Sequence, residues 1–131
     1  MPLVTGILET ALYVSDVARS RQFYEGLFGF RVVAEGARLT ALAVRAGQVL
    51  LLFRKKASVS LGNSAHDGDG QLHLAFAVAA ADLAAWEARL AERGIAIVER
   101  KTWDLGGHSL YFRDPDGHLV ELATPGVWTN Y

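Results

Sequence analysis

The chain has 131 residues, the size of one ordinary domain, and 51% of them are hydrophobic, which is enough for a substantial core. The formal net charge is −1, and the charged residues are scattered along the chain. The basic patch that nucleic-acid binding requires is therefore not expected. There is no cysteine, which excludes disulfides and thiolate metal ligands and is typical of a reducing cytoplasm. No signal peptide is predicted, and no apolar run approaches the ~20 residues that cross a bilayer.

The first half of the chain predicts a strand, a helix and three more strands. Ser15 or Asp16 can cap the helix, because each side chain offers an oxygen to the free N–H groups of the first turn. Gly29 is expected to end it. Alternating and helical spacing of apolar residues predicts strands at 7–14, 30–34, 39–44 and 49–53, with the helix after residue 16.

The same order returns in the second half, after a segment at 55–70 that is rich in Gly, Ser, Asn and Asp and is predicted to be a linker. Strands are expected at 72–78, 95–99, 108–113 and 118–123, with a helix at 82–93 and a turn at 114–117. The predicted fold is therefore α+β. It consists of two βαβββ modules, about 7–54 and 71–124, whose mixed sheets curve into one cup with the helices outside. Together they form a single domain over 1–131.

A polar residue occupies the same slot in the first strand of each half. Residues 8–14 and 72–78 share one layout, with Glu9 and His73 in the matching position. Side chains alternate along a strand, so each polar residue shares a face with small alanines, while the larger apolar residues share the other face. The large apolar face should pack on the helix. The face with Glu9 or His73 should line the cup, where small residues leave room for a ligand.

The last hairpin is expected to add a carboxylate to the same face. A four-residue turn would pair Leu110 with Glu121, and opposed residues of an antiparallel pair share a face. Glu121 should then point into the cup beside His108 and Phe112. In the first half the matching slot holds Leu51, so that half lacks the carboxylate.

Two motifs resemble the vicinal oxygen chelate superfamily, also described as glyoxalase/bleomycin-resistance/dioxygenase proteins. The resemblance runs over roughly residues 7–125 and implies paired βαβββ modules and usually a homodimer. The superfamily includes lyases, epimerases, ring-cleaving dioxygenases, thiol transferases acting on antibiotics, and metal-free drug-binding proteins. The matching residues are Tyr13-Val14-Ser15-Asp16 with Phe23-Tyr24-Glu25-Gly26-Leu27-Phe28-Gly29-Phe30, and Tyr111-Phe112-Arg113-Asp114-Pro115-Asp116-Gly117-His118-Leu119-Val120-Glu121-Leu122.

The resemblance also implies a divalent metal ion, held by residues on the first and last strands of the modules. Those slots are Glu9, Leu51, His73 and Glu121 in this chain, and Leu51 cannot coordinate. A three-ligand set remains, which leaves positions open for substrate oxygens. Two carboxylates and one neutral imidazole carry a charge of −2 that a divalent cation would neutralise. This oxygen-rich set suits Mn²⁺, Fe²⁺, Ni²⁺, Co²⁺ or Zn²⁺.

Each ligand also has a plainer interpretation. His73 alone on a strand could be a hydrogen-bonded packing residue, and Glu9 could pair with an arginine or lie at a dimer surface. Glu121 is harder to explain without a partner, because a buried unpaired carboxylate is costly. His66 in the linker is expected to be solvated, and His118 to be structural or exposed.

Other side chains are candidates for the pocket itself. Glu121 and His108 are the candidate acid–base groups, although His108 could equally lie at the rim. Arg38 could hold an anionic substrate or neutralise Glu9. The aromatic candidates for substrate contact, which core packing would explain equally well, are Tyr13, Phe53, Trp103 and Phe112.

Two functions follow. The first is a metal-dependent enzyme of lyase, isomerase or dioxygenase type, acting on a small molecule that offers oxygens to the metal. The second is a non-catalytic protein that sequesters a drug or metabolite in a dry aromatic cleft. A thiol transferase is less favoured, because no cluster of Lys, Arg and Tyr for a phosphonate is evident. The sequence leaves open whether the site forms within one chain or between two chains of a dimer.

Overall fold

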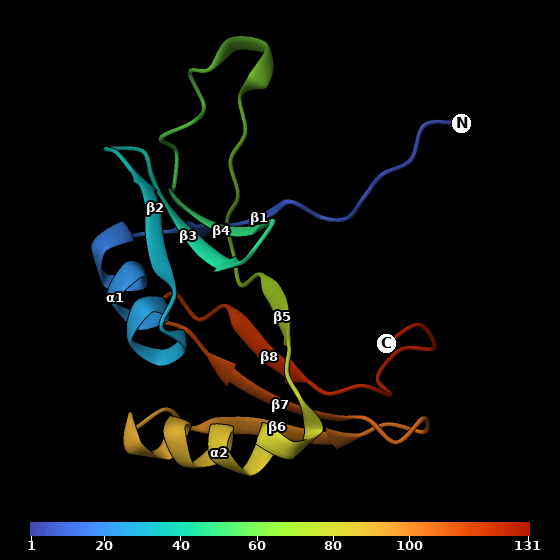
Figure 1. Ribbon diagram of the computed structural model, residues 1–131. Helices are drawn as coiled ribbons and strands as arrows, with labels where there is room; N and C mark the ends of the chain where they lie inside the picture. The colour runs from blue at the N-terminus through green and yellow to red at the C-terminus, as the bar shows by residue number, and fades with distance from the viewer. The chain divides into compact units, whose positions relative to one another are not determined.

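The computed structural model describes all 131 residues and divides into two compact units, residues 1–69 and 70–131. Each unit contains one four-stranded mixed sheet and one longer helix, labelled in Figure 1. The α+β class and the repeated βαβββ order are therefore confirmed. The union of the two sheets in one cup stays a prediction. No helix combines the length and the apolar character of a membrane span.

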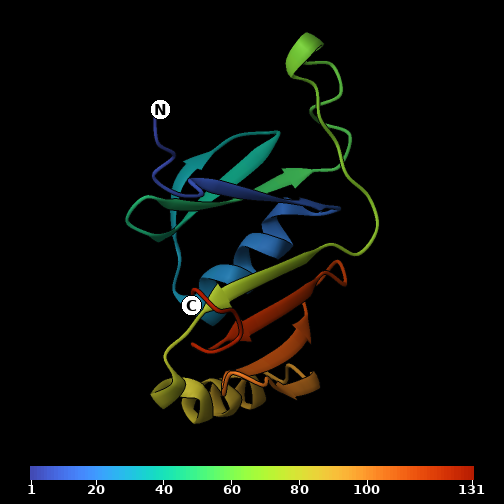
Figure 2. The same ribbon diagram turned by 90° about the vertical axis from the view of Figure 1, so that its right-hand side faces the viewer.

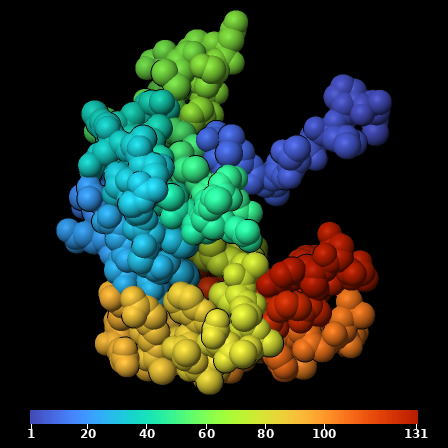
Figure 3. Space-filling model, in the orientation of Figure 1, coloured from blue at the N-terminus to red at the C-terminus, as the bar shows by residue number.

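Unit 1 has the sheet order β1-β4-β3-β2, in which β1 runs parallel to β4 and the other pairs are antiparallel. Helix α1 lies along one face of this sheet (Figure 2). The first residues extend away from the unit, as Figure 3 shows in blue. The elements are β1 (Glu9–Val14), α1 (Val17–Phe28), β2 (Arg31–Glu35), β3 (Leu39–Arg45), β4 (Gln48–Arg54) and a 3₁₀ turn (Gly62–Ser64).

The caps of α1 are those that the sequence predicts. Of the two candidate N-caps, Asp16 accepts a hydrogen bond from the backbone N–H of Arg19 at 3.1 Å. Gly29 ends the helix in the left-handed conformation, with φ of 73°, which a residue without Cβ adopts at little cost. In β1, Leu12 and Val14 are buried and Glu9 is exposed, so the predicted division of its faces is confirmed for these residues. Thr10 and Leu8 of the predicted buried face, however, are exposed.

Unit 2 has the matching order β5-β8-β7-β6, with β5 parallel to β8. The strand predicted at 95–99 lies instead at Ile97–Thr102. The N–H of Ile95 bonds to Leu90 O at 2.9 Å, and that of Gly94 to Ala91 O at 3.0 Å, which closes the end of α2. Ile95 is therefore part of a helix cap. The elements are β5 (His73–Ala77), a 3₁₀ turn (Ala80–Asp82), α2 (Leu83–Glu92), β6 (Ile97–Thr102), β7 (His108–Arg113) and β8 (Leu119–Ala123).

The predicted register of the last hairpin is wrong by one residue. Asp114 N–H bonds to His118 O at 3.0 Å, so the loop between β7 and β8 has three residues and not four. Its last residue, Gly117, has φ of 82°, as expected for a three-residue hairpin loop. The strands consequently pair Tyr111 with Glu121.

This shift exchanges the two faces of β7 relative to Glu121, because the side-chain period of a strand is two. Ser109 and Tyr111 share the face of Glu121. Phe112 is fully buried on the other face, so its predicted place in the pocket is wrong. His108 alternates with Phe112, and its predicted place beside Glu121 is wrong for the same reason.

Candidate metal and substrate site

Two of the three predicted metal ligands meet in unit 2. His73 lies on β5 and Glu121 on β8, and these neighbouring strands are parallel. The atoms His73 Nε2 and Glu121 Oε2 are 3.2 Å apart. The Glu121 side chain is 8% exposed and that of His73 is 51% exposed. A buried carboxylate therefore faces an imidazole that solvent or a ligand can reach.

The orientation of His73 suits a metal ligand. Its Nδ1 is 3.0 Å from Leu119 O, and because a carbonyl can only accept, Nδ1 carries a proton. Nε2 then either carries a second proton, which gives an ion pair with Glu121, or presents a lone pair to a cation shared with the carboxylate. Metal-binding histidines usually donate their other N–H to a carbonyl or carboxylate in this way. A 3.2 Å separation also fits two atoms that each lie about 2.1 Å from one ion.

The other carboxylate oxygen of Glu121 is held from behind. Ser109 Oγ donates to Glu121 Oε1 at 2.5 Å, and Trp103 Nε1 donates to the same Ser109 Oγ at 2.8 Å. Ser109 is buried, so the chain of hydrogen bonds lies in a region of low dielectric, where it orients the carboxylate strongly. Trp103, predicted as a pocket aromatic, thus acts in the structure as a donor that positions Ser109.

Tyr111 adds a phenol beside Glu121, and Lys101 adds a cation over the rings of Tyr111 and Trp103. Burial raises the pKa of Tyr111, a hydrogen bond to Glu121 raises it further, and a hydrogen bond to Ser109 opposes them. The phenol therefore keeps its proton at neutral pH. Lys101 Nζ lies 5.4 Å from the centre of the Tyr111 ring and 5.5 Å from that of Trp103.

Sequence reasoning missed Ser109 and Tyr111 as neighbours of Glu121, and Lys101 as a neighbour of Tyr111. The assumed hairpin register placed Ser109 and Tyr111 on the wrong face, and Lys101 lay beyond the predicted end of its strand. The available signal was Gly117, whose left-handed conformation is typical of the last position of a three-residue loop.

The other two histidines of unit 2 have different surroundings. His108 Nδ1 lies 3.2 Å from Thr102 Oγ1 and the residue is exposed. His118 is buried, and its Nδ1 accepts the backbone N–H of Leu72 at 2.9 Å. His118 therefore has a structural role, which is one of the two alternatives that the sequence left open.

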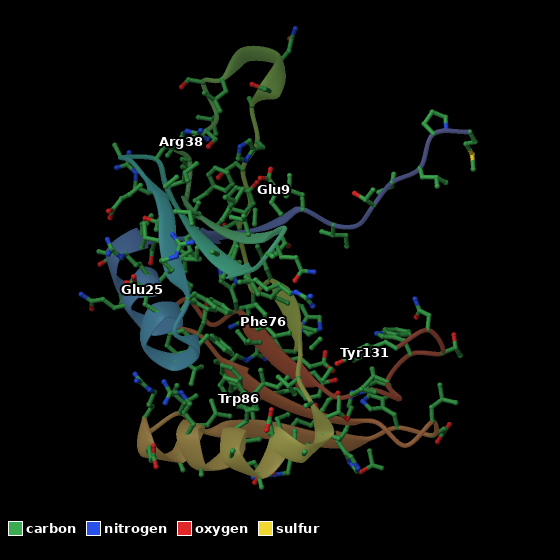
Figure 4. The ribbon with its side chains drawn as sticks, in the orientation of Figure 1. Glu9, Glu25, Arg38, Phe76, Trp86 and Tyr131 are labelled. Carbon is green, nitrogen blue, oxygen red and sulfur yellow. The ribbon has the colours of Figure 1, made fainter.

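Unit 1 contains a separate part of the predicted site. A cavity of about 240 Å³ opens on the face of β1 and β4 that carries Glu9. Ala11 and Leu51 also line it, in agreement with the predicted face. Tyr13 and Phe53 form an aromatic wall, with ring centres 5.7 Å apart and planes 21° apart. Figure 4 labels Glu9 on this unit.

Two residues of unit 1 differ from expectation. His66 is not simply solvated, because it lines the cavity and its Nδ1 is 2.7 Å from the Tyr13 hydroxyl. The glycine-rich composition of the linker gives no sign that the chain returns to the sheet. Arg38 does not neutralise Glu9; it donates to Ser58 Oγ at 2.8 Å and lies 5.3 Å from the centre of the Phe53 ring.

The third proposed ligand belongs to the other unit. Glu9 lies in unit 1, whereas His73 and Glu121 lie in unit 2. No three His, Asp or Glu side chains of this structure form a group that could hold a metal ion. The complete set of Glu9, His73 and Glu121 therefore stays a prediction.

The family model of the Glyoxalase/Bleomycin resistance protein/Dioxygenase superfamily matches residues 6–122. The chain belongs to this superfamily. The membership that the sequence motifs indicate is thus confirmed.

Individual members of the superfamily resemble the chain over nearly its whole length. The metallothiol transferase FosB of Bacillus licheniformis is 29% identical over 95% of this chain and 79% of its own. FosB of Staphylococcus epidermidis is 28% identical over 93% of this chain and 85% of its own. The structure of lactoylglutathione lyase from Agrobacterium tumefaciens has a TM-score of 0.89 at 30% identity, covering 96% of this chain and 98% of that one. These relatives are enzymes, in agreement with the prediction of an enzyme and not of a sequestering protein.

Proposed function

We propose that this protein is a metal-dependent vicinal oxygen chelate enzyme whose divalent ion is held by His73, Glu121 and Glu9. The observation that carries the proposal is the pairing of His73 Nε2 with Glu121 Oε2 at 3.2 Å, with each side chain fixed by a further hydrogen bond. The ion would be Mn²⁺, Fe²⁺, Ni²⁺, Co²⁺ or Zn²⁺. When bound, it would polarise the oxygens of a small substrate and neutralise the charge that develops on them.

The neighbouring side chains have roles of their own in this proposal. Tyr111 keeps its proton and can donate a hydrogen bond, or the proton itself, to a substrate oxygen beside Glu121. Lys101, which is 44% exposed and pairs with Glu99 Oε1 at 3.8 Å, supplies a cation that an anionic substrate group could contact in place of Glu99. Ser109 and Trp103 keep the carboxylate in place, which preserves the geometry of the site. This arrangement suits a lyase, an isomerase or a dioxygenase.

Thiol transfer is the second candidate. The FosB relatives are named as metallothiol transferases, and Lys101 and Tyr111 supply part of the cationic and phenolic cluster that was not evident in the sequence. In such a reaction a thiolate attacks an electrophilic carbon of the small substrate, and a leaving oxygen takes up a proton. Loss of free thiol in the presence of the substrate would distinguish this reaction from isomerisation, which consumes none.

The metal is the first part of the proposal to test. Protein purified without chelators is expected to retain about one divalent ion per chain, measured by inductively coupled plasma mass spectrometry. After dialysis against EDTA, calorimetric titration with Mn²⁺, Ni²⁺ and Zn²⁺ should show one site per chain. His73→Ala should weaken that site at least about tenfold, and His108→Ala, on the opposite face, should not. Absence of a titratable site in the wild-type protein would refute the proposal.

The proposed homodimer raises a question that mixed variants can answer. If Glu9 of one chain completes the site of its partner, a dimer of one Glu9→Gln chain and one Glu121→Gln chain contains one intact site. If each site lies within one chain, both sites of the mixed dimer are damaged. Recovery of tight binding for up to one ion per mixed dimer in co-refolded variants, measured by calorimetry, would show that the site is shared between two chains. Absence of recovery in dimers verified by native mass spectrometry would place the site within a single chain.

A further inference from the structure

The cavity of unit 1 has a corner in which three rings from distant parts of the chain meet. The His66 ring lies edge-on to Phe53, with centres 4.5 Å apart and planes 74° apart. It also lies edge-on to Tyr13, whose hydroxyl is 2.7 Å from His66 Nδ1. Such edge-to-face and stacked rings are favourable arrangements of aromatic side chains. Strands β1 and β4 and the linker thus build one aromatic corner.

The linker loop, defined as residues 55–69, holds His66 in this position. The backbone N–H of His66 donates a hydrogen bond to Ser58 O at 3.3 Å. Ser58 is buried, and its Oγ accepts a hydrogen bond from the Arg38 side chain. Ordering a loop costs conformational entropy, which these contacts must offset. Two more contacts close the loop near its ends, namely the ion pair of Lys55 with Asp69 at 2.8 Å and the bond from Lys56 N–H to Asp67 Oδ1 at 2.9 Å.

Gly68 shows how closely the loop approaches the corner. A Cβ atom at this position would lie 2.3 Å from Tyr13 Cδ2 and 3.0 Å from Tyr13 Cγ. These atoms belong to the base of the ring and not to a flexible chain end. The loop backbone therefore packs directly on Tyr13, and only glycine fits there without displacing the ring.

The remaining nitrogen of His66 is available to a ligand. Nδ1 is engaged by Tyr13, which fixes the plane of the ring, and Nε2 forms no hydrogen bond in the structure. His66 is half-buried and lines the cavity, so its ring lies beside the aromatic walls of Tyr13 and Phe53. The volume, about 240 Å³, is below the roughly 300–1,000 Å³ of cavities for drug-sized ligands. It suits one ring-sized group.

We propose that His66 determines substrate specificity, and that this cavity binds a planar unsaturated group of the substrate, such as an aromatic ring. The group packs against Tyr13 and Phe53, and a polar atom attached to it bonds to His66 Nε2. The inference rests on the proposed function in one respect, because Glu9, a proposed metal ligand, lines the same cavity. The substrate oxygens would then be close to the ring that the cavity holds.

Two hydroxamates with the same chelating oxygens test this inference. Benzohydroxamate carries an aromatic ring, and acetohydroxamate carries a methyl group in its place. In calorimetric titrations of Ni²⁺-loaded protein, we expect benzohydroxamate to bind at least about tenfold more tightly, because its ring is buried in the cavity. Benzohydroxamate has no polar atom on its ring, so His66→Ala tests the ring contact: loss of the imidazole that closes the corner should reduce this preference to about twofold and leave acetohydroxamate unchanged. Asn63→Ala, on the exposed turn of the same loop, is the matched control and should keep the preference.

Gly68→Ala provides a second variant, because crowding of Tyr13 should displace the loop and reduce the same preference even if His66→Ala folds poorly. Equal binding of the two hydroxamates, or a preference that survives in both variants, would overturn the inference. Phenol added to metal-free protein separates this outcome from failure of the metal proposal. Phenol should shift the NMR signals of Tyr13 and His66 even if neither hydroxamate binds. If phenol also leaves these signals unchanged, the inference is wrong.

Discussion

Glu121→Gln is expected to lower the affinity for the divalent ion at least about 100-fold and to lower the activity by a similar factor. Glutamine has nearly the same shape, and its carbonyl oxygen can still accept from Ser109. It lacks the negative charge that Glu121 directs at His73 Nε2 from 3.2 Å. Removal of residues that only orient a metal ligand already costs about 10–100-fold in affinity, so loss of an anionic ligand should cost at least as much.

Calorimetric titration of chelator-treated protein measures this effect directly. Glu92→Gln is the control, because it makes the same chemical change at an exposed position on α2. It should bind the ion as the wild type does. If Glu121→Gln kept its affinity within about twofold, with unchanged circular dichroism, Glu121 could not be a metal ligand.

The sequence predicted the fold well wherever a local signal had only one interpretation. The two ends of α1 were predicted correctly at Asp16 and Gly29. A carboxylate before a helical pattern is typical of an N-cap, and a glycine directly after the pattern is typical of a left-handed C-cap. Likewise, the alternation in β1 separated Leu12 from Glu9 correctly, since one face must be buried. These features depend on near neighbours in the chain, which a single sequence contains.

The candidate site was predicted less completely, because it depends on a register and on a distant loop. Assuming one extra residue in the last turn placed His108, and not Tyr111, beside Glu121. Periodicity could not reveal this error, because β7 has buried side chains on both faces: Ser109 and Tyr111 on one, Phe112 on the other. Nor could composition show that His66 returns to Tyr13 across more than fifty residues of chain.

The register also predicts two unlike effects for adjacent residues of β7. Phe112 is fully buried, so Phe112→Ala should remove a large side chain from the core and leave a cavity. Substitutions of this kind cost about 3–5 kcal/mol. Tyr111→Phe should retain the packing of the ring and remove only its hydroxyl, at a cost of about 1–2 kcal/mol. It should instead weaken substrate binding or turnover beside Glu121.

Urea unfolding followed by tryptophan fluorescence measures these costs in the relevant unit, because Trp86, Trp103 and Trp128 all lie in unit 2. The urea concentration at the midpoint of unfolding should fall strongly for Phe112→Ala and only slightly for Tyr111→Phe. The slope of the unfolding free energy against urea concentration should be similar in both variants. The register that places Phe112 in the pocket requires the opposite, because a pocket side chain can be removed at little cost in stability but with loss of ligand binding. A stable Phe112→Ala variant with weakened binding would therefore restore that register and remove Tyr111 from the site.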